Sequence, residues 1–149
     1  MKNKGFSLVE LIIVIAIMAI LAGALAPALI KYINKSRLST DIDNGATIAR
    51  TIMAAVTDDD AFKDAQEVKD TDPPRNVNDM QGDTFKQIVF NNLGVTHVQG
   101  GAKKDVDGGS LNQNYYYRLD SARNKVEVYY GGTDSDYMVY PSLGSKLSY

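Results

Sequence analysis

The feature that most constrains this chain is an uninterrupted apolar run near its beginning, from Leu11 to Ile30. These twenty residues contain no charged and no strongly polar side chain. As a helix rising about 1.5 Å per residue they would extend about 30 Å, the thickness of a bilayer's hydrocarbon core. We therefore expect a membrane-spanning helix, and a wholly water-soluble protein is excluded on physical grounds.

A cleaved secretory signal peptide is the alternative interpretation of this run. Its apolar region would normally be about 7–15 residues long and end at a small-residue cleavage site. Residues 24–26 (Ala-Leu-Ala) could supply such a site, but the run is too long and Pro27 follows directly. We therefore favour a helix that is retained in the mature protein.

The remainder of the sequence is polar and mildly acidic. Residues 31–149 carry 14 basic and 17 acidic side chains, which argues against a basic nucleic-acid binder. Cysteine is absent and His97 is the single histidine, so no disulfide framework and no thiolate or histidine metal cluster can be built. The length of 149 residues supports one globular domain. We expect a protein that is not an enzyme and that needs no cofactor and no metal.

Charged residues lie on both sides of the apolar run. Lys2 and Lys4 precede it and favour a cytoplasmic N-terminus, although Lys31, Lys35 and Arg37 follow it closely, so charge alone leaves the orientation open. Glu10 stands where the run begins. An acidic side chain costs about 2.5–3.5 kcal/mol at the bilayer centre and less near its edge, so a functional partner is the default expectation. The alternative is a favourable interaction with the helix dipole, worth at most about 1 kcal/mol.

Small residues and a proline modify the second half of the run. Small residues recur four positions apart, a spacing that allows close packing of helices in lipid: the pairs are Ala19 and Gly23, Ala22 and Ala26, and Ala24 and Ala28. Pro27 has no N–H to donate to the carbonyl of Gly23. The sequence therefore predicts a kink or weak point over Gly23–Pro27 in an otherwise continuous helix.

The segment from residue 4 to residue 10 (Lys-Gly-Phe-Ser-Leu-Val-Glu), followed directly by the apolar run, resembles the N-terminus of type IV prepilins and the related pseudopilins. The resemblance covers about residues 2–38. It implies cleavage between Gly5 and Phe6 by a membrane prepilin peptidase, followed by N-methylation of Phe6. It also implies that Glu10 recognises an N-terminal amine during assembly, and it makes Pro27 the family's helix proline.

The implied pairing of Phe6 with Glu10 has a physical basis. Cleavage would expose an α-amino group with a reference pKa of about 7.7–8.0, so it is positive at pH 7. Buried among apolar helices, the amine and the carboxylate would each be costly alone, and breaking such a pair costs about 3–5 kcal/mol. The pair would therefore set the register at which a subunit joins a fibre.

Beyond the membrane the helix is expected to continue to residue 56. An apolar stripe with spacings of three and four supports this: it consists of Leu38, Ile42, Ala46, Ala49, Ile52, Met53 and Val56. Asp41, Asp43, Asn44 and Arg50 would form the polar face. The expected divisions are a cleaved leader (1–5), a transmembrane and assembly helix (6–30), its amphipathic continuation (31–56) and a globular head (57–149).

Within the head, residues 57–80 form an acidic connection with a short helical turn over 61–69, and Pro73-Pro74 excludes a helix there. Residues 83–94 predict a helix with Asp83 as N-cap and Gly94 as its stop. Strands are expected over 115–119, 125–130 and 137–140, the first two joined by a turn at 120–124. The predicted fold class is α+β, with a long helix, kinked near Pro27, whose C-terminal half packs on a small antiparallel sheet.

Other motifs are weaker. The loop 105–109 resembles the start of a calcium site, but Tyr116 stands where the bidentate Glu belongs. Asp134 and Asp136 resemble the calcium-binding loop of major pseudopilins, although acidic turns are the more common explanation. Asn34-Lys35-Ser36 fits a glycosylation pattern that we discount, because it lies in a helix close to the membrane. The tyrosines, most of which follow residue 114, fit ordinary sheet composition.

The function that the resemblance implies is that of a structural subunit, a major pilin, polymerising into a type IV pilus. Its partners would be copies of itself, the prepilin peptidase and methyltransferase, the assembly platform and minor pilins. It would pass from the cytoplasmic membrane as a single-pass precursor to a surface fibre serving adhesion or twitching motility. Alternatives are a pseudopilin of type II secretion or DNA uptake, the latter alone implying nucleic acid, and a single-pass envelope ligand-binding protein. Many pilins close a C-terminal loop with a disulfide, which this chain lacks.

Overall fold

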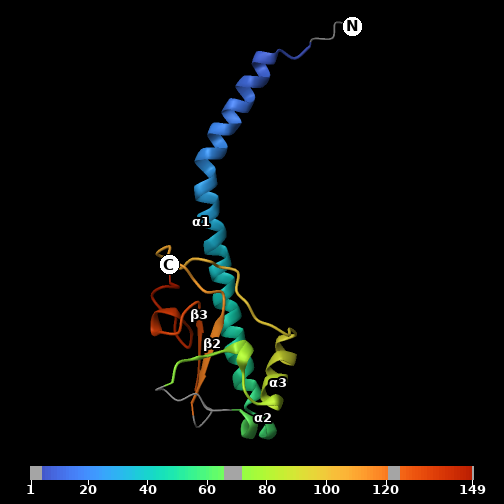
Figure 1. The fold of residues 1–149 in the computed structure, drawn as a ribbon, viewed down its shortest axis with the longest axis vertical. Coiled ribbons are helices and arrows are strands. Elements are labelled where there is room, and N and C mark those ends of the chain that lie inside the picture. Colours follow the sequence, from blue (N-terminus) through green and yellow to red (C-terminus); the bar gives the residue numbers. More distant parts are fainter. Residues whose placement is uncertain (1–4, 66–71, 121–124, 149) are drawn as a thin grey trace. The chain divides into compact units, whose positions relative to one another are not determined.

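One long helix, α1 (Leu8–Ala55), runs through both of the units into which the chain divides (Figure 1). The computed structural model describes residues 5–65, 72–120 and 125–148. The units are Met1–Ile33 and Asn34–Tyr149. The helix begins two residues after the expected Phe6 and ends one residue before the expected position 56, so the predicted continuous helix is confirmed.

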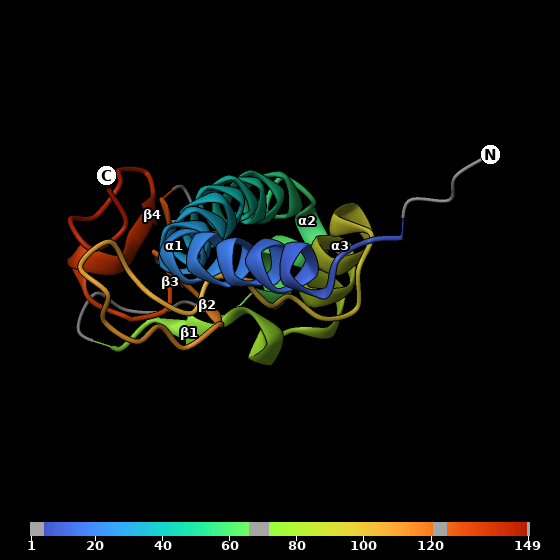
Figure 2. The same cartoon turned by 90° about the horizontal axis from the view of Figure 1, so that it is seen from above.

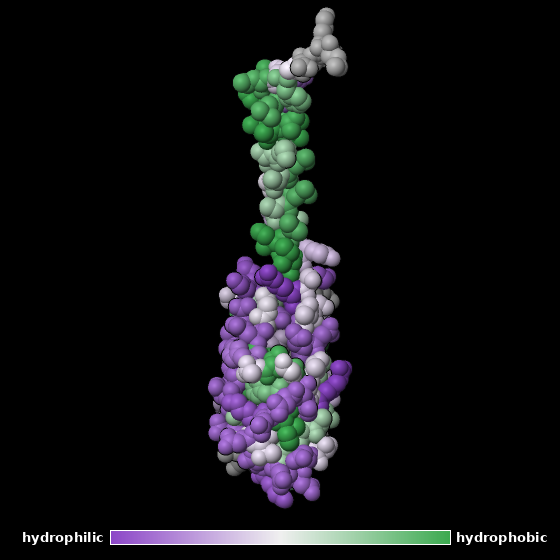
Figure 3. Space-filling view, turned by 90° about the vertical axis from the view of Figure 1, so that its right-hand side faces the viewer, coloured by the Kyte–Doolittle hydropathy of each residue, from purple (hydrophilic) through white to green (hydrophobic). Residues whose placement is uncertain are grey.

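The first unit consists of the beginning of α1 and the residues before it. Every described residue from 5 to 33 is exposed, and the surface of this part is almost entirely apolar (Figure 3). By length and composition α1 is able to cross a membrane. The helix runs without interruption through Pro27. The kink over Gly23–Pro27 stays a prediction.

The second unit combines the rest of α1 with a four-stranded antiparallel sheet. The strands lie in the order β1 (Arg75–Asn76), β2 (Tyr115–Leu119), β3 (Val126–Tyr130) and β4 (Met138–Tyr140). Two short helices, α2 (Asp59–Asp64) and α3 (Asp83–Leu93), lie on the opposite side of the unit from β4 (Figure 2). Single turns of 3₁₀ helix at Val77–Asp79 and Ser135–Tyr137 complete it. The predicted α+β class, a long helix packed on a small antiparallel sheet, is confirmed.

The sheet turns large side chains toward α1. Along β2, Tyr115, Tyr117 and Leu119 are buried and alternate with half-buried neighbours, as the two-residue period of a strand requires. Tyr115 pairs with Tyr130 of β3, and their ring centroids lie 4.9 Å apart. These residues pack with Leu38, Ile48 and Ile52 of α1 in one hydrophobic core, which explains why the strands are rich in tyrosine.

The helix face that packs on the sheet differs from the predicted stripe. Leu38, Ala49 and Ile52 are buried as predicted, and three others of the stripe are partly buried. Met53 is 39% exposed, so its assignment to the core was wrong. The buried face instead includes Asp41, which the apolar pattern assigned to the polar side, and which is only 3% exposed.

Asp41 is buried because its carboxylate anchors a loop. The backbone N–H groups of Gly101 and Ala102 donate to it over 2.7–2.9 Å, and the Tyr115 hydroxyl lies 3.3 Å from Oδ1. The Tyr130 hydroxyl in turn donates to the carbonyl of Ala102. A buried carboxylate is tolerated when hydrogen bonds replace its water, so the polar residue serves the core here.

Gly45 explains how closely the sheet approaches α1. A Cβ atom built on Gly45 would lie 2.6 Å from Cγ1 of Val139 in β4. Glycine costs a helix interior about 1 kcal/mol relative to alanine. At this position the missing side chain makes room for the strand.

The predicted cap of the helix at residues 83–94 was wrong. The N-cap position is occupied by Gly82, with φ 93°, and glycine has no side chain that could cap the helix. The Asp64 carboxylate instead accepts the N–H groups of Thr84, at 2.7 Å, and Phe85, at 3.3 Å. The end of the helix is as predicted, with Gly94 in the left-handed conformation. A cap supplied from another helix is invisible to local sequence patterns.

The three predicted strands are confirmed to within one residue, whereas β1 has only two residues and was missed. The predicted turn over 120–124 lies outside the described residues except for residue 120. Residues 66–69, the later part of the predicted helical turn over 61–69, lie outside them too. The earlier part of that turn belongs to α2.

The C-terminal segment folds back along the sheet without any cross-link. The Gly144 N–H donates to the carbonyl of Met138 at 2.8 Å, and the Lys146 N–H donates to that of Asp136 at 3.0 Å. The Val106 N–H donates to the carbonyl of Lys146, and Leu147 is fully buried. This segment, red in Figure 1, is therefore closed by hydrogen bonds and one apolar side chain.

Candidate assembly site

The beginning of α1 holds the residues that the sequence singles out. Gly5, Phe6 and Ser7 precede the helix, Phe6 being 80% exposed, and Glu10 lies in the first turn. Lys2, Lys4 and the rest of residues 1–4 lie outside the described residues. Phe6 and Glu10 are thus separated by about one helical turn, which brings the predicted cleavage position and the predicted amine-binding carboxylate to the same end of one helix.

Glu10 folds back to the start of its own helix. The Ser7 N–H donates to Oε2 of Glu10 at 2.9 Å, and the Leu11 N–H donates to the carbonyl of Ser7 at 3.2 Å. Ser7 is therefore the N-cap residue of α1, and the Glu10 side chain, three residues later, accepts the backbone N–H of Ser7. This is one half of a capping box, in which a Glu at the third helical position reaches back to the cap residue.

The bond to Ser7 sets where the Glu10 carboxylate stands. It lies at the positive end of the helix dipole, beside the peptide that would become the new N-terminus after cleavage. The side chain is exposed, so it remains accessible to a group from outside the molecule. A carboxylate has further lone pairs, and a second donor, such as an amine, can be accepted alongside the Ser7 N–H.

Sequence reasoning missed the role of Ser7, although the signal was present. Ser7-Leu8-Val9-Glu10 is the Ser-x-x-Glu pattern that marks helix N-termini. Gly23, farther along the helix, has nothing within 4 Å of an added Cβ, and the small residues around it are exposed. That stretch is consequently open to close approach by another helix.

The weak calcium candidates, Asp134 and Asp136, lie at the 3₁₀ turn before β4, where Asp134 bonds the local backbone and Asp136 bonds a side chain of the C-terminal segment. Asp134 accepts the N–H of Asp136 at 3.0 Å, and Asp136 accepts the Ser145 hydroxyl at 2.8 Å. In residues 5–65, 72–120 and 125–148, no group of three or more His, Asp or Glu side chains is arranged to hold a metal ion.

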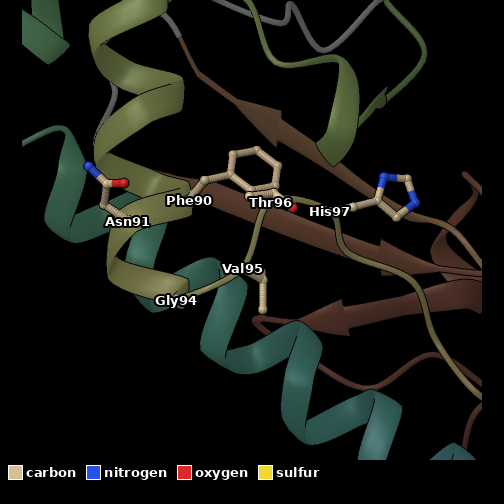
Figure 4. A pocket seen from close by; sticks show the side chains of 6 residues that line it. All are labelled: Phe90, Asn91, Gly94, Val95, Thr96 and His97. Atoms are coloured by element: carbon tan, nitrogen blue, oxygen red, sulfur yellow. The ribbon is translucent and has the colours of Figure 1, made fainter.

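Two open hollows flank the loop after α3. One, of about 550 Å³, is lined by six residues (Figure 4): Phe90, Asn91, Gly94, Val95, Thr96 and His97. The other, of about 240 Å³, lies between this loop and α1 and shares Val95 and His97. The His97 imidazole is exposed, as expected for a loop residue, and the polar side chains of the larger hollow do not converge on a common point (Figure 4).

Asn34, the candidate glycosylation residue, is engaged in the fold. Its Nδ2 donates to the carbonyl of Lys104 at 2.8 Å, and its Oδ1 accepts the Lys103 N–H at 3.2 Å. The side chain thereby ties the loop at 103–104 to α1. Because this amide already takes part in two hydrogen bonds, it is less available for glycosylation.

Comparison with known proteins agrees with the N-terminal geometry. Residues 1–26 match the family described as the prokaryotic N-terminal methylation motif, which is the signature of type IV pilins and prepilins. No curated protein and no solved structure matched the chain. The N-terminus of the chain is thus similar to that of prepilin-type proteins, and the architecture, a long helix on a small antiparallel sheet, matches the pilin fold that the resemblance implies.

Proposed function

We propose that this protein is a structural subunit, the major pilin, of a type IV pilus. The observation that carries the proposal is the methylation motif at residues 1–26 together with a helix whose apolar side chains from residue 8 to residue 33 are all exposed in the single chain. Such a surface is stable only in lipid or against other apolar helices. A precursor held in the membrane and a fibre with these helices at its centre supply the two environments in turn.

The proposed maturation uses the start of α1. Prepilin peptidase cleaves between Gly5 and Phe6, and Phe6 is then N-methylated. The new amine is cationic at neutral pH, since a secondary methylamine keeps the charge of the primary one. In the growing fibre it pairs with the Glu10 carboxylate of a neighbouring copy.

Small residues and Pro27 support close packing in the proposed fibre. Without a gain from burying apolar area in lipid, helices associate through small side chains that let their backbones approach. Gly23 offers such a surface. The missing hydrogen bond at Pro27 lets the Gly23–Pro27 stretch bend or loosen as copies pack.

A pseudopilin, of type II secretion or of DNA uptake, is the second candidate, because its N-terminus would read the same. Against the pseudopilin of type II secretion, the oxygens of Asp134 and Asp136 accept hydrogen bonds from the chain itself. An envelope ligand-binding protein would keep its leader uncleaved. We also propose that the chain is not an enzyme, since a single histidine and no cysteine leave few nucleophile and base pairs to build.

The first experiment is to shear surface appendages from native cells and to measure the mass of the N-terminal peptide in the fibre fraction. Abundant protein beginning at methylated Phe6 in that fraction supports the major pilin. The same peptide found in the membrane fraction alone supports the pseudopilin. An intact leader in both fractions contradicts the processing of this chain.

A Gly5→Glu variant tests the assigned cleavage position in the same cells. It is expected to remain at precursor size in the membrane, because the substitution places a charged side chain directly before the assigned bond. A band of mature size from Gly5→Glu would show that the chain is cut elsewhere.

A further inference from the structure

Three exposed cations gather around the first residues of the second unit. Arg37 lies on α1, and Lys103 and Lys104 lie on the loop that Asn34 holds. The Arg37 stem lies beside this loop, since its Cγ and Cδ are each 3.7 Å from a Cβ built on Gly101. We call Arg37, Lys103 and Lys104 the cationic cluster. It is anchored from two points of α1, Asn34 and Asp41, so its lysine backbones are fixed.

The acidic residues nearby do not neutralise the cluster. Asp105 is 5% exposed, and its Oδ1 accepts the N–H groups of Asp107 at 3.0 Å and Gly109 at 2.7 Å. Asp107 pairs with Lys146 at 2.7 Å, and Asp41 is buried beneath the loop. Among the residues that the structure describes, no ion pair involves a side chain of the cluster.

The cluster follows the apolar run closely along the chain. Asn34 comes four residues after Ile30, the last residue of the run, and α1 is continuous between them. Four residues of helix rise about 6 Å. The headgroup region of a bilayer extends roughly this far beyond each side of the hydrocarbon core. Because only four residues of chain separate Asn34 from the run, a loop fixed to Asn34 is kept near the headgroups whenever the run spans the core.

We propose that the cationic cluster binds the phosphates of anionic phospholipid headgroups on the side of the membrane that carries the head. The proposal rests on the membrane-held precursor of the proposed function and adds a partner to it. Each cation held at an anionic surface contributes about a fivefold gain in binding. Lipid is favoured over nucleic acid because three cations on a mildly acidic chain are few for a polyanion, whereas the short stretch of chain after the apolar run keeps them near headgroups.

The absence of cysteine makes the test direct, because one introduced thiol is the only one present. Ser110 is exposed and bridges to Lys104 across the small hairpin of this loop. The full chain with Ser110→Cys, labelled with a polarity-sensitive fluorophore, is inserted into phosphatidylcholine vesicles with or without phosphatidylglycerol. We expect phosphatidylglycerol to shift the label's emission toward that of a drier environment, and added salt to reverse the shift.

Matched variants locate the effect. Lys103→Gln with Lys104→Gln is expected to raise the phosphatidylglycerol content needed for half of the shift, through a loss of about 25-fold in binding, fivefold for each lysine. Arg50→Gln with Lys63→Gln removes the same charge from exposed positions farther along the chain and is expected to leave the shift unchanged. An equal loss in both double variants would overturn the proposal, since it would reflect net charge alone.

The remaining outcomes separate the two proposals. Failure of the unlabelled chain to float with phosphatidylcholine vesicles would contradict membrane insertion, and with it the proposed function. Insertion with no response of the label to phosphatidylglycerol would overturn the lipid proposal alone. A cluster-dependent shift caused by duplex DNA, but not by phosphatidylglycerol, would assign the cluster to nucleic acid instead.

Discussion

The two parts of α1 share one backbone but face different surroundings. From residue 8 to residue 33 every side chain is exposed, although most are apolar. From residue 34 to residue 55 one face is buried in the core, formed by Leu38, Asp41, Gly45, Ile48, Ala49, Ile52 and Ala55. The same secondary structure thus leaves its apolar surface unsatisfied in one part and satisfied in the other.

Each part contains an acidic residue and a glycine whose surroundings can be compared: Glu10 and Gly23 in the first, Asp41 and Gly45 in the second. Glu10 is exposed and accepts one backbone N–H, whereas Asp41 is buried and accepts donors from two backbone amides and a tyrosine. Gly23 has open space around it, and Gly45 is packed against Val139. The difference teaches that the first part is prepared for partners outside the chain, and the second for partners within it.

The largest expected effect comes from the acid of the first part. Glu10→Ala is expected to lower the amount of this protein in sheared fibres at least about a hundredfold, because breaking a buried charge pair costs about 3–5 kcal/mol. Insertion into the membrane should be unchanged. Fibre yield is measured in cells that lack the wild-type copy, and normal fibres there would refute the pairing of Phe6 with Glu10.

Asp41, the buried acidic residue of the second part, is expected to contribute to the stability of the fold. Asp41→Ala leaves the Gly101 and Ala102 N–H groups without their acceptor, at about 1–3 kcal/mol for each buried group. We expect a loss of about 3 kcal/mol in the free energy of unfolding, measured by denaturant titration of the full chain in detergent. Asp43→Ala, on the exposed face, is the control and should change it by less than about 0.5 kcal/mol.

Alkaline pH probes the same buried group of residues. Burial and the nearby negative charge of Asp41 raise the pKa values of Tyr115 and Tyr130 above the usual value. Unfolded tyrosines ionise near pH 10, so their contribution to stability is complete below that pH and declines above it, by about 1.4 kcal/mol per pH unit for each tyrosine. Burial raises the pKa of Tyr117 as well, so three tyrosines contribute to this slope. Unfolding free energy measured between pH 9 and 11 should begin to fall near pH 10, with a slope about one third smaller in Tyr130→Phe.

The glycines provide the next comparison, with opposite signs. Gly45→Ala places a Cβ 2.6 Å from Val139 and should cost about 1–2 kcal/mol of unfolding free energy, despite the better helix propensity of alanine. Gly23→Ala meets nothing within 4 Å and should stabilise its stretch of helix by up to about 1 kcal/mol. Thermal unfolding followed by circular dichroism measures both, and equal effects would break the contrast between the two parts of α1.

The smallest expected effect concerns the cap of α3 in the second unit. Asp64→Ala removes the acceptor for the first turn of α3 and should cost about 1 kcal/mol. Asp83→Ala, the residue that the sequence favoured as the cap, should cost only a few tenths. Denaturant titration measures both variants, and a larger loss of unfolding free energy for Asp83→Ala than for Asp64→Ala would show that Asp83 is the cap.

Sequence patterns predicted what local periodicity determines. The long helix, the Gly94 stop and three strands follow from apolar spacing, from a glycine in a left-handed turn and from β-branched and aromatic runs. Asp41 was assigned to the polar face, and the roles of Gly45 and Asp64 were not predicted, because their partners are distant in sequence: the loop at 101–102, Val139 and Thr84. The two-residue β1 has no pattern of its own. At the candidate site the motif supplied Phe6 and Glu10, but the donor role of Ser7 required geometry.

The closure of the C-terminal segment by hydrogen bonds and Leu147 has a consequence for how the head matures. No oxidant and no disulfide-exchange enzyme are needed to complete it, and reducing conditions leave its closure unchanged. Contacts of this kind also break and re-form within the lifetime of the folded protein, because each is worth only about 1 kcal/mol. A fibre built from such heads can be stretched and released without losing a covalent bond that would have to be remade.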